Sequence, residues 1–186
     1  IEDRLCQMIL EEYVEGRGEI KILEVGCASG QRMSFLKDKG FDVYGIEPSS
    51  KAVDHAIANG LNVIQSTAEK IPFNTNLFDV VIFGFCLYLV DPSDYFTVCS
   101  EANRVLKKGG SIYIKDFCPK YPYNNDYVHK DGISSFKFDH STMFTAHPNY
   151  MLLKKEIFTH SGSKKDKLNM DEWVQICQIV KFRTEF

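Results

Sequence analysis

An apolar segment that runs directly into a glycine turn constrains the fold of this chain more than any other feature. Residues 20–25 are rich in Ile, Leu and Val and predict a buried strand, and the next five residues, 26–30, begin and end with glycine. A helix is expected over residues 32–39, with Met33 and Leu36 on its buried face. A strand, a tight turn and a helix in this order predict the first unit of an open parallel sheet.

A second strand is expected over residues 41–46, and it ends at the acidic Glu47. A glycine turn after one strand and a carboxylate at the end of the next is how an open parallel sheet holds an adenosine-type cofactor. The carboxylate accepts hydrogen bonds from the ribose hydroxyls, and glycine lets the backbone approach the ligand. The spacing differs from the G-x-G-x-x-G of dinucleotide sites, because three residues separate Gly26 from Gly30 and Glu24 lies two residues before the first glycine.

The rest of the chain alternates between strand and helix patterns, which predicts right-handed crossovers and a doubly wound sheet. Helix patterns span residues 3–15, 48–60 and 94–106, and strand patterns span residues 61–65, 78–83, 111–117, 150–159 and 172–182. Residues 118–149 are rich in aromatic and polar residues without a period. We therefore expect one α/β domain over residues 1–186, with residues 118–149 as a substrate-facing insertion.

Composition narrows the classes of function. The chain has 186 residues, enough for one α/β domain, and its net charge of -3 gives no general attraction to nucleic acid or anionic lipid. No apolar run approaches the length of a membrane span, and no signal-peptide pattern is present. The six cysteines form no C-x-x-C pair, which favours a reducing, cytoplasmic location. Cys27, in the glycine turn, is expected to be a small packing residue rather than a nucleophile.

Five ordered segments carry a resemblance to a known family. They are the Glu24 to Gly30 turn, Ser-Thr-Ala-Glu-Lys-Ile-Pro-Phe at 66–73, Phe-Asp-Val-Val-Ile-Phe-Gly-Phe at 78–85, Leu-Tyr-Leu-Val-Asp-Pro at 87–92 and Arg-Val-Leu-Lys-Lys-Gly-Gly at 104–110. In this order they resemble the class I S-adenosylmethionine-dependent methyltransferases. The resemblance implies a Rossmann-like, mostly parallel seven-stranded sheet of order 3-2-1-4-5-7-6 with an antiparallel C-terminal hairpin. It also implies S-adenosylmethionine as cofactor and S-adenosylhomocysteine as product.

The resemblance places the cofactor contacts in the glycine turn, at the ribose carboxylate and after the third and fourth strands. The implied residues are Glu24, Gly26, Cys27, Ala28, Gly30, Glu47, Pro48, Thr67, Ala68, Glu69, Phe83, Gly84 and Phe85. Two residues depart from the family's pattern: Ala28 stands where the family has its central glycine, and Thr67 stands where it has the Asp of the adenine loop. No metal is expected, because the spacing of the histidines matches no compact ligand motif.

Methyl transfer from a sulfonium requires a nucleophile aligned with the S–CH₃ bond, exclusion of water, and a base when the nucleophile is a hydroxyl. Aromatic faces such as those of Phe83, Phe85 and Tyr88 favour a sulfonium through cation–π attraction. The candidate bases are His140 beside Asp139, Tyr88 and His129. A purely structural role in a polar loop stays open for each of them.

The function expected is methyl transfer to a small-molecule or sugar/glycan hydroxyl, since residues 131–150 are loosely similar to bacterial methyltransferases of surface-glycan or nucleotide-sugar biosynthesis. A macromolecule (RNA or protein) methyltransferase is an alternative, although the net charge and the absence of an Asn/Asp-Pro-Pro-Tyr/Phe element speak against nucleic acid. A non-catalytic S-adenosylmethionine-binding or scaffold subunit is a third hypothesis, and it stays open because Ala28 and Thr67 depart from the family's pattern. A nicotinamide oxidoreductase fits the turn least well. The oligomeric state is left open.

Overall fold

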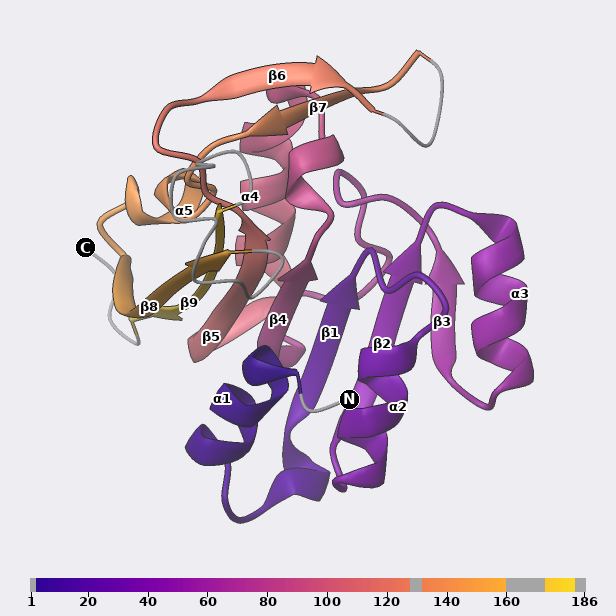
Figure 1. Ribbon diagram of the computed structural model, residues 1–186. Helices are drawn as coiled ribbons and strands as arrows, with labels where there is room; N and C mark the ends of the chain where they lie inside the picture. The colour runs from indigo at the N-terminus through magenta and orange to yellow at the C-terminus, as the bar shows by residue number, and fades with distance from the viewer. Residues whose placement is uncertain (1–2, 128–131, 160–172, 183–186) are drawn as a thin grey trace.

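A seven-stranded sheet forms the centre of the structure, a computed structural model that describes residues 3–127, 132–159 and 173–182. The strands run in the order β3-β2-β1-β4-β5-β9-β8 (Figure 1). They are β1 (Lys21–Val25), β2 (Asp42–Glu47), β3 (Asn62–Gln65), β4 (Phe78–Gly84), β5 (Leu106–Phe117), β8 (Tyr150–Thr159) and β9 (Trp173–Lys181). Neighbours from β3 to β5 are parallel, and β9 pairs antiparallel with both β5 and β8. The predicted order 3-2-1-4-5-7-6 with its C-terminal hairpin is confirmed.

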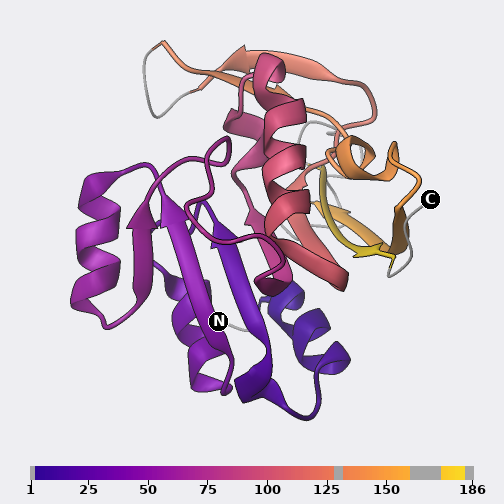
Figure 2. The same ribbon diagram turned by 180° about the vertical axis from the view of Figure 1, so that it is seen from behind.

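Helices cover both faces of the sheet. They are α1 (Arg4–Glu12), α2 (Gln31–Asp38) and α3 (Ser50–Ala58), which share one hydrophobic core, and α4 (Tyr95–Val105), which packs into a second core on the opposite face (Figures 1 and 2). Because β4 contributes to both cores, Phe78 and every residue from Val80 to Phe83 are fully buried. This confirms the prediction from its continuous apolar run. None of the helices in the described part of the chain is long and apolar enough to cross a bilayer.

Local chemistry sets where the first helices begin. The Asp3 side chain accepts the N–H of Leu5 and caps α1, and the Ser49 hydroxyl accepts the N–H of Ala52 and caps α3. Helix α2 begins instead at Gly30, whose φ of +80° lies in the left-handed region and where a Cβ would overlap the Leu61 side chain. The second glycine of the turn therefore serves both the backbone bend and the packing of α2 on the sheet.

The structure differs from the sequence prediction within residues 118–149. It contains a separate two-stranded ribbon, β6 (Tyr123–Asp126) and β7 (Ser134–Lys137), and the short helix α5 (Thr142–Thr145). The ribbon lies above the end of the sheet toward which the parallel strands point (Figure 1). The sequence Tyr-Asn-Asn-Asp has no apolar alternation, so a ribbon held by backbone pairing leaves no periodic signal. Strand β5 also begins earlier than predicted, because Leu106 already pairs with Phe78 before the register shifts.

The core beneath β4 gives a direct stability prediction. Phe78 is fully buried and makes edge-to-face contacts with Phe73 and Tyr44, with ring centroids 5.1 and 5.7 Å apart. Phe78→Ala should lower the free energy of unfolding by about 3–5 kcal/mol, because it removes the ring and leaves a cavity. Phe96→Ala, at a ring that is 89% exposed, is the control and should change it by about 0.5 kcal/mol or less. Urea unfolding measures both, and equal effects would contradict the assigned core.

Candidate functional site

The glycine turn lies where the C-terminal ends of β1 and β2 meet. The N–H groups of Gly26 and Cys27 both donate to the Ile46 carbonyl oxygen of β2, at 2.9 and 3.1 Å. Ala28 has a φ of +47°, a left-handed conformation that costs an L residue about 1–2 kcal/mol relative to its preferred conformations. This explains why a glycine suits the position. The turn is therefore fastened to the neighbouring strand before it reaches α2.

The carboxylate of Glu47, at the end of β2, lies against this turn. Its Oε2 accepts the N–H of Ala28 and its Oε1 accepts the N–H of Ser49, both at 3.0 Å. A carboxylate has lone pairs for further donors, so these bonds fix its position without exhausting its acceptor capacity. The predicted ribose-binding carboxylate is thus placed beside the glycine turn by backbone contacts on both of its oxygens.

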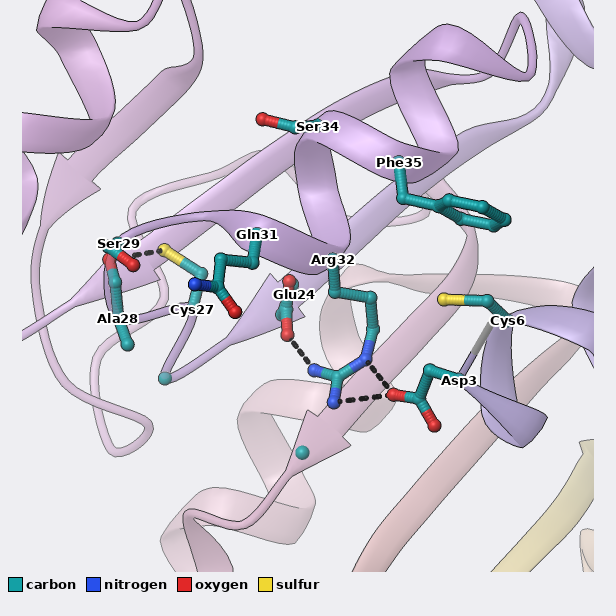
Figure 3. Close-up of a pocket in the computed structure, with 12 residues that line it drawn as sticks. Asp3, Cys6, Glu24, Cys27, Ala28, Ser29, Gln31, Arg32, Ser34 and Phe35 are labelled. Carbon is teal, nitrogen blue, oxygen red and sulfur yellow. Dashed lines mark hydrogen bonds and ion pairs between the residues drawn. The ribbon is translucent and has the colours of Figure 1, made fainter. Parts of the chain in front are cut away.

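A cavity of about 540 Å³ opens next to the turn, in the size range of small-molecule sites. Five residues predicted to contact the cofactor line it: Glu24, Gly26, Cys27, Ala28 and Gly84. The remaining lining residues come from the start of α1, from α2 and, in the case of Ser29, from the turn itself, as the close-up in Figure 3 shows. The cavity therefore joins the end of β1, the end of β4 and two helices.

A network of buried charges forms one wall of the cavity (Figure 3). The Arg32 guanidinium donates through Nη1 to Glu24 Oε1, and its Nε and Nη2 lie 3.1 and 3.0 Å from Asp3 Oδ2. The other Asp3 oxygen accepts from Lys115 Nζ at 2.8 Å. The Arg32 side chain is 15% exposed and that of Glu24 only 2%. A Cβ on Gly84 would overlap the guanidinium, so glycine at the end of β4 makes room for it.

Burial governs the protonation of these groups. It raises the pKa of the Glu24 carboxyl to about 7, even though Arg32 favours the ionised form. Burial also opposes ionisation of Asp3, but Lys115 and Arg32 outweigh it and lower the pKa of that carboxyl. Glu24 Oε2 is buried and has no hydrogen-bond partner among the described residues, so an acceptor is left for a ligand. Burial raises the pKa of the Cys27 thiol to about 12, which fits a packing role.

Other predicted cofactor residues lie at the same edge but do not line the cavity. They are Gly30, Glu47, Pro48, Thr67, Ala68, Glu69, Phe83 and Phe85. Residues 67–69 follow β3, whose Gln65 pairs with Glu47. The expectation that the ring of Phe83 faces the sulfonium does not fit the structure, because this ring is fully buried and packs on Phe144, 5.7 Å between centroids.

The three candidate bases have different surroundings. The Tyr88 ring is half-buried and packs on Phe117, and burial raises the pKa of its hydroxyl. His140 is fully buried against Phe138, with centroids 4.2 Å apart, and burial lowers the pKa of its imidazole to about 4. The neighbouring Asp139 carboxylate accepts hydrogen bonds from Ser141 and Lys155. His129 lies outside the described residues.

Sequence reasoning missed the part played by Arg32, Asp3 and Lys115. Arg32 was only the first residue of an expected helix, and polar residues at such positions are normally solvated. Nothing local indicates that α1, β4 and β5 surround the guanidinium in the folded chain. A charged residue two positions after the second glycine, together with an acidic residue in the preceding strand, is the signal that could have pointed to this pair.

The Arg32 network predicts a large loss of stability when only one charge is removed. Arg32→Met should lower the free energy of unfolding by about 3–5 kcal/mol, because it leaves the buried Glu24 without its cation. The double variant Glu24→Gln, Arg32→Met should recover at least half of this loss. Arg4→Met is the control, because the Arg4 side chain is 38% exposed and its ion pairs should contribute about 1 kcal/mol or less. Equal losses in Arg4→Met and Arg32→Met would contradict the assigned burial.

His140 predicts an acid-dependent loss of stability. Its folded pKa of about 4 lies below the usual 6.5, so between these values the unfolded chain binds a proton that the folded chain does not. Stability should therefore fall as the pH falls, by about 2 kcal/mol at pH 5 for this group. In His140→Phe the difference in unfolding free energy between about pH 8 and pH 5 should shrink by that amount. His55→Phe, on the exposed side of α3, should retain the wild-type difference. A shrinkage of the same size in both variants would contradict the assignment.

Comparisons with known proteins agree with this geometry. A sequence profile for the family described as a methyltransferase domain matches residues 23–114. An uncharacterized methyltransferase of Synechocystis sp. is 32% identical over 117 residues, 62% of this chain and 55% of the relative. A demethylmenaquinone methyltransferase of Chlorobaculum tepidum is 33% identical over 116 residues, 61% of this chain and 46% of the relative. The chain thus spans about half the length of these curated relatives.

The fold has close counterparts among solved structures. The crystal structure of a SAM-dependent methyltransferase from Methanosarcina mazei superposes with a TM-score of 0.76 over 95% of this chain and 98% of that chain, at 18% identity. At this identity the likeness concerns the fold, and it extends beyond the segment that the sequence profile matches. The ordered motifs, the sheet order and the matched profile agree: the chain belongs to the class I S-adenosylmethionine-dependent methyltransferase family.

Proposed function

We propose that this chain binds S-adenosylmethionine at the glycine turn and transfers its methyl group to a small-molecule acceptor by in-line displacement. The observation that carries the proposal is the Glu47 carboxylate, held against the turn by the N–H groups of Ala28 and Ser49 beside a cavity of about 540 Å³. A carboxylate at the end of the second strand is the group that recognises ribose hydroxyls in sheets of this kind.

The residues around the cavity fit the two ends of such a cofactor. Glu47 would accept the ribose hydroxyls, and the unpartnered Oε2 of Glu24 would accept hydrogen bonds from an ammonium group. Arg32 holds the other Glu24 oxygen and so fixes the orientation of this acceptor. The cofactor supplies a methyl group activated on a sulfonium, with a neutral thioether as leaving group. The chain's own residues are then required chiefly to orient the reactants and to exclude water.

The acceptor is proposed to lie above the ends of β4 and β5, beneath the β6–β7 ribbon (Figure 1). Residues 118–149 form the substrate-facing part of a single domain in this proposal. The rings of Phe85, Tyr88 and Phe117 gather at these strand ends and suit a flat or sugar-like molecule. A sugar or glycan hydroxyl is one acceptor class, and the relative named for demethylmenaquinone suggests a quinol as another.

Of the candidate residues that the structure describes, Tyr88 has the most suitable position for contact with a hydroxyl acceptor. It is half-buried at the strand ends, whereas His140 is fully buried, and His129 stays a prediction. The raised pKa of Tyr88 keeps its hydroxyl protonated near neutral pH, so we propose that it orients the acceptor through a hydrogen bond. The cysteines are all free thiols, which fits the proposed cytoplasmic location.

Isothermal titration with S-adenosylmethionine, S-adenosylhomocysteine and NADH tests the cofactor assignment. Micromolar binding of both sulfur nucleosides and none of NADH is expected. Glu47→Ala should weaken binding about 5- to 150-fold, equivalent to about 1–3 kcal/mol, because ribose hydroxyls lose a charged acceptor. Glu47→Gln retains one acceptor oxygen, so its affinity for the nucleosides should lie between those of the wild type and Glu47→Ala. Asp54→Ala, at an exposed carboxylate on α3, should bind like the wild type.

The same titration separates the alternatives. An unchanged affinity in Glu47→Ala would show that the ribose assignment is wrong. No binding of either nucleoside would favour a scaffold role, in which the left-handed Ala28 and the Thr67 substitution have impaired the site. After binding is established, a screen of sugars, nucleotide sugars and quinols with labelled methyl groups tests the acceptor. Labelling of RNA or protein alone would replace the small-molecule proposal.

A further inference from the structure

A buried carboxylate at the end of β5 lies outside the cavity described above. Asp116 is fully buried, and its two oxygens accept three backbone N–H groups. Oδ2 accepts from Leu87 at 3.0 Å and from Tyr88 at 3.3 Å, and Oδ1 accepts from Phe117 at 2.8 Å. Removing a carboxylate from water is costly unless such donors surround it. The arrangement therefore ties the carboxylate to the particular backbone that donates.

Two of the donors belong to the post-β4 loop, residues 85–90. Phe85 begins this loop with a φ of +57°, which L residues rarely adopt, and its N–H donates to the Lys115 carbonyl oxygen at 2.7 Å. The Cys86 thiol donates to the Val25 carbonyl oxygen at 3.2 Å. These anchors lie on β1 and β5, the two strands that flank β4. The loop is thus held in a bent conformation from both sides.

The post-β4 loop connects the cofactor cavity with the aromatic residues at the strand ends. Gly84, which directly precedes it, lines the cavity beside Arg32. On its other side Phe85 and Tyr88 both pack on Phe117, with centroid separations of 5.5 and 5.0 Å. A methyl acceptor has to reach the cofactor from the open end of the strands. The two rings therefore lie where the orientation of the acceptor would be decided.

We propose that Asp116 is a positioning residue: its carboxylate fixes the backbone of the post-β4 loop and thereby places Phe85 and Tyr88 on the acceptor side of the methyl-transfer site. The location of that site rests on the proposed function, whereas the attachment of the loop to Asp116 rests on the hydrogen bonds from Leu87 and Tyr88.

The protonation state of the Asp116 carboxyl should control how firmly the post-β4 loop is attached. Burial raises its pKa to about 7, and the backbone N–H groups act in the opposite direction because they favour the ionised form. By linkage, protonation must then weaken the same contacts. The side chains of Cys86, Tyr88 and Tyr95 interact electrostatically with Asp116, and burial raises the pKa of each, so all three are neutral near pH 7.

Two further neighbours complete the surroundings of Asp116. The uncharged Gln175 of β9 lies opposite it in the antiparallel pair and is fully buried. Lys115, the preceding residue in β5, points to the other face of the sheet and pairs with Asp3. Glu24, the other carboxyl whose pKa burial raises to about 7, interacts electrostatically with Cys86 of this loop. A titration near neutral pH is therefore assigned to Asp116 when Asp116→Asn abolishes it and Glu24→Gln does not.

The test is an NMR titration of the backbone amides of the full chain between about pH 5.5 and 8.5. The amide protons of Leu87, Tyr88 and Phe117 should shift together with one apparent pKa, because each donates to the titrating carboxylate. In Asp116→Asn the three amide shifts should stay constant over this range, and the ring resonances of Phe85 and Tyr88 should move relative to the wild type.

Asp79→Asn is the matched control, because Asp79 also accepts a backbone N–H, from Lys21 at 2.9 Å, at the start of β1. It should leave the titration of the three amides unchanged. Binding of S-adenosylhomocysteine should stay within about threefold of the wild type in both variants, since neither carboxylate lines the cavity. The role of Asp116 would be overturned if the three amides do not titrate in the wild type, or if they titrate equally in the wild type and in Asp116→Asn.

A titration that persists in Glu24→Gln decides this question even if Asp116→Asn does not fold. A failure of S-adenosylhomocysteine to bind the wild type is a separate result, because it would overturn the proposed function while the amide titration still reports on the attachment of the loop.

Discussion

The buried guanidinium of Arg32 joins four elements that are far apart in the sequence. It reaches from α2 to Glu24 on β1 and to Asp3 at the start of α1, and Asp3 in turn pairs with Lys115 on β5. Buried charges are costly unless each has a partner, so these elements must assemble together for any of the pairs to be favourable. The wall of the proposed cofactor cavity is thus part of what orders α1 against the sheet, and in this proposal binding and stability depend on the same residues.

The same structural device occurs twice at the functional edge. Glu47, at the end of β2, accepts the N–H of Ala28 from the turn that follows its neighbour β1, and Asp116, at the end of β5, accepts N–H groups from the loop that follows its neighbour β4. In both cases the segment includes a non-glycine residue with positive φ, Ala28 or Phe85. A charged acceptor with several backbone donors is strong enough to hold such conformations. The two loops that border the proposed reaction centre are fixed in this way.

The sequence predicted the sheet well because its strands leave strong local signals. Strand β4 is covered on both faces, so its residues form a continuous apolar run, and the strand order followed from motifs that the family shares. The β6–β7 ribbon was missed, because Tyr123–Asp126 is polar and is held by backbone pairing. The prediction that the Phe83 ring faces the cofactor was wrong for a related reason: motif position places its backbone at the edge, whereas the ring packs toward Phe144.

The fold class, the family and the positions of the glycine turn and of Glu47 can be read along the chain, because these depend on contiguous segments with their own periodicity and spacing. Which polar residues are buried and paired follows instead from how the elements pack. Arg32 and Asp116 look like ordinary charged residues in the sequence, and their surroundings come from elements distant along the chain. Burial and partner distance set the cost and the pKa of a charge, and both quantities exist only after those elements have packed.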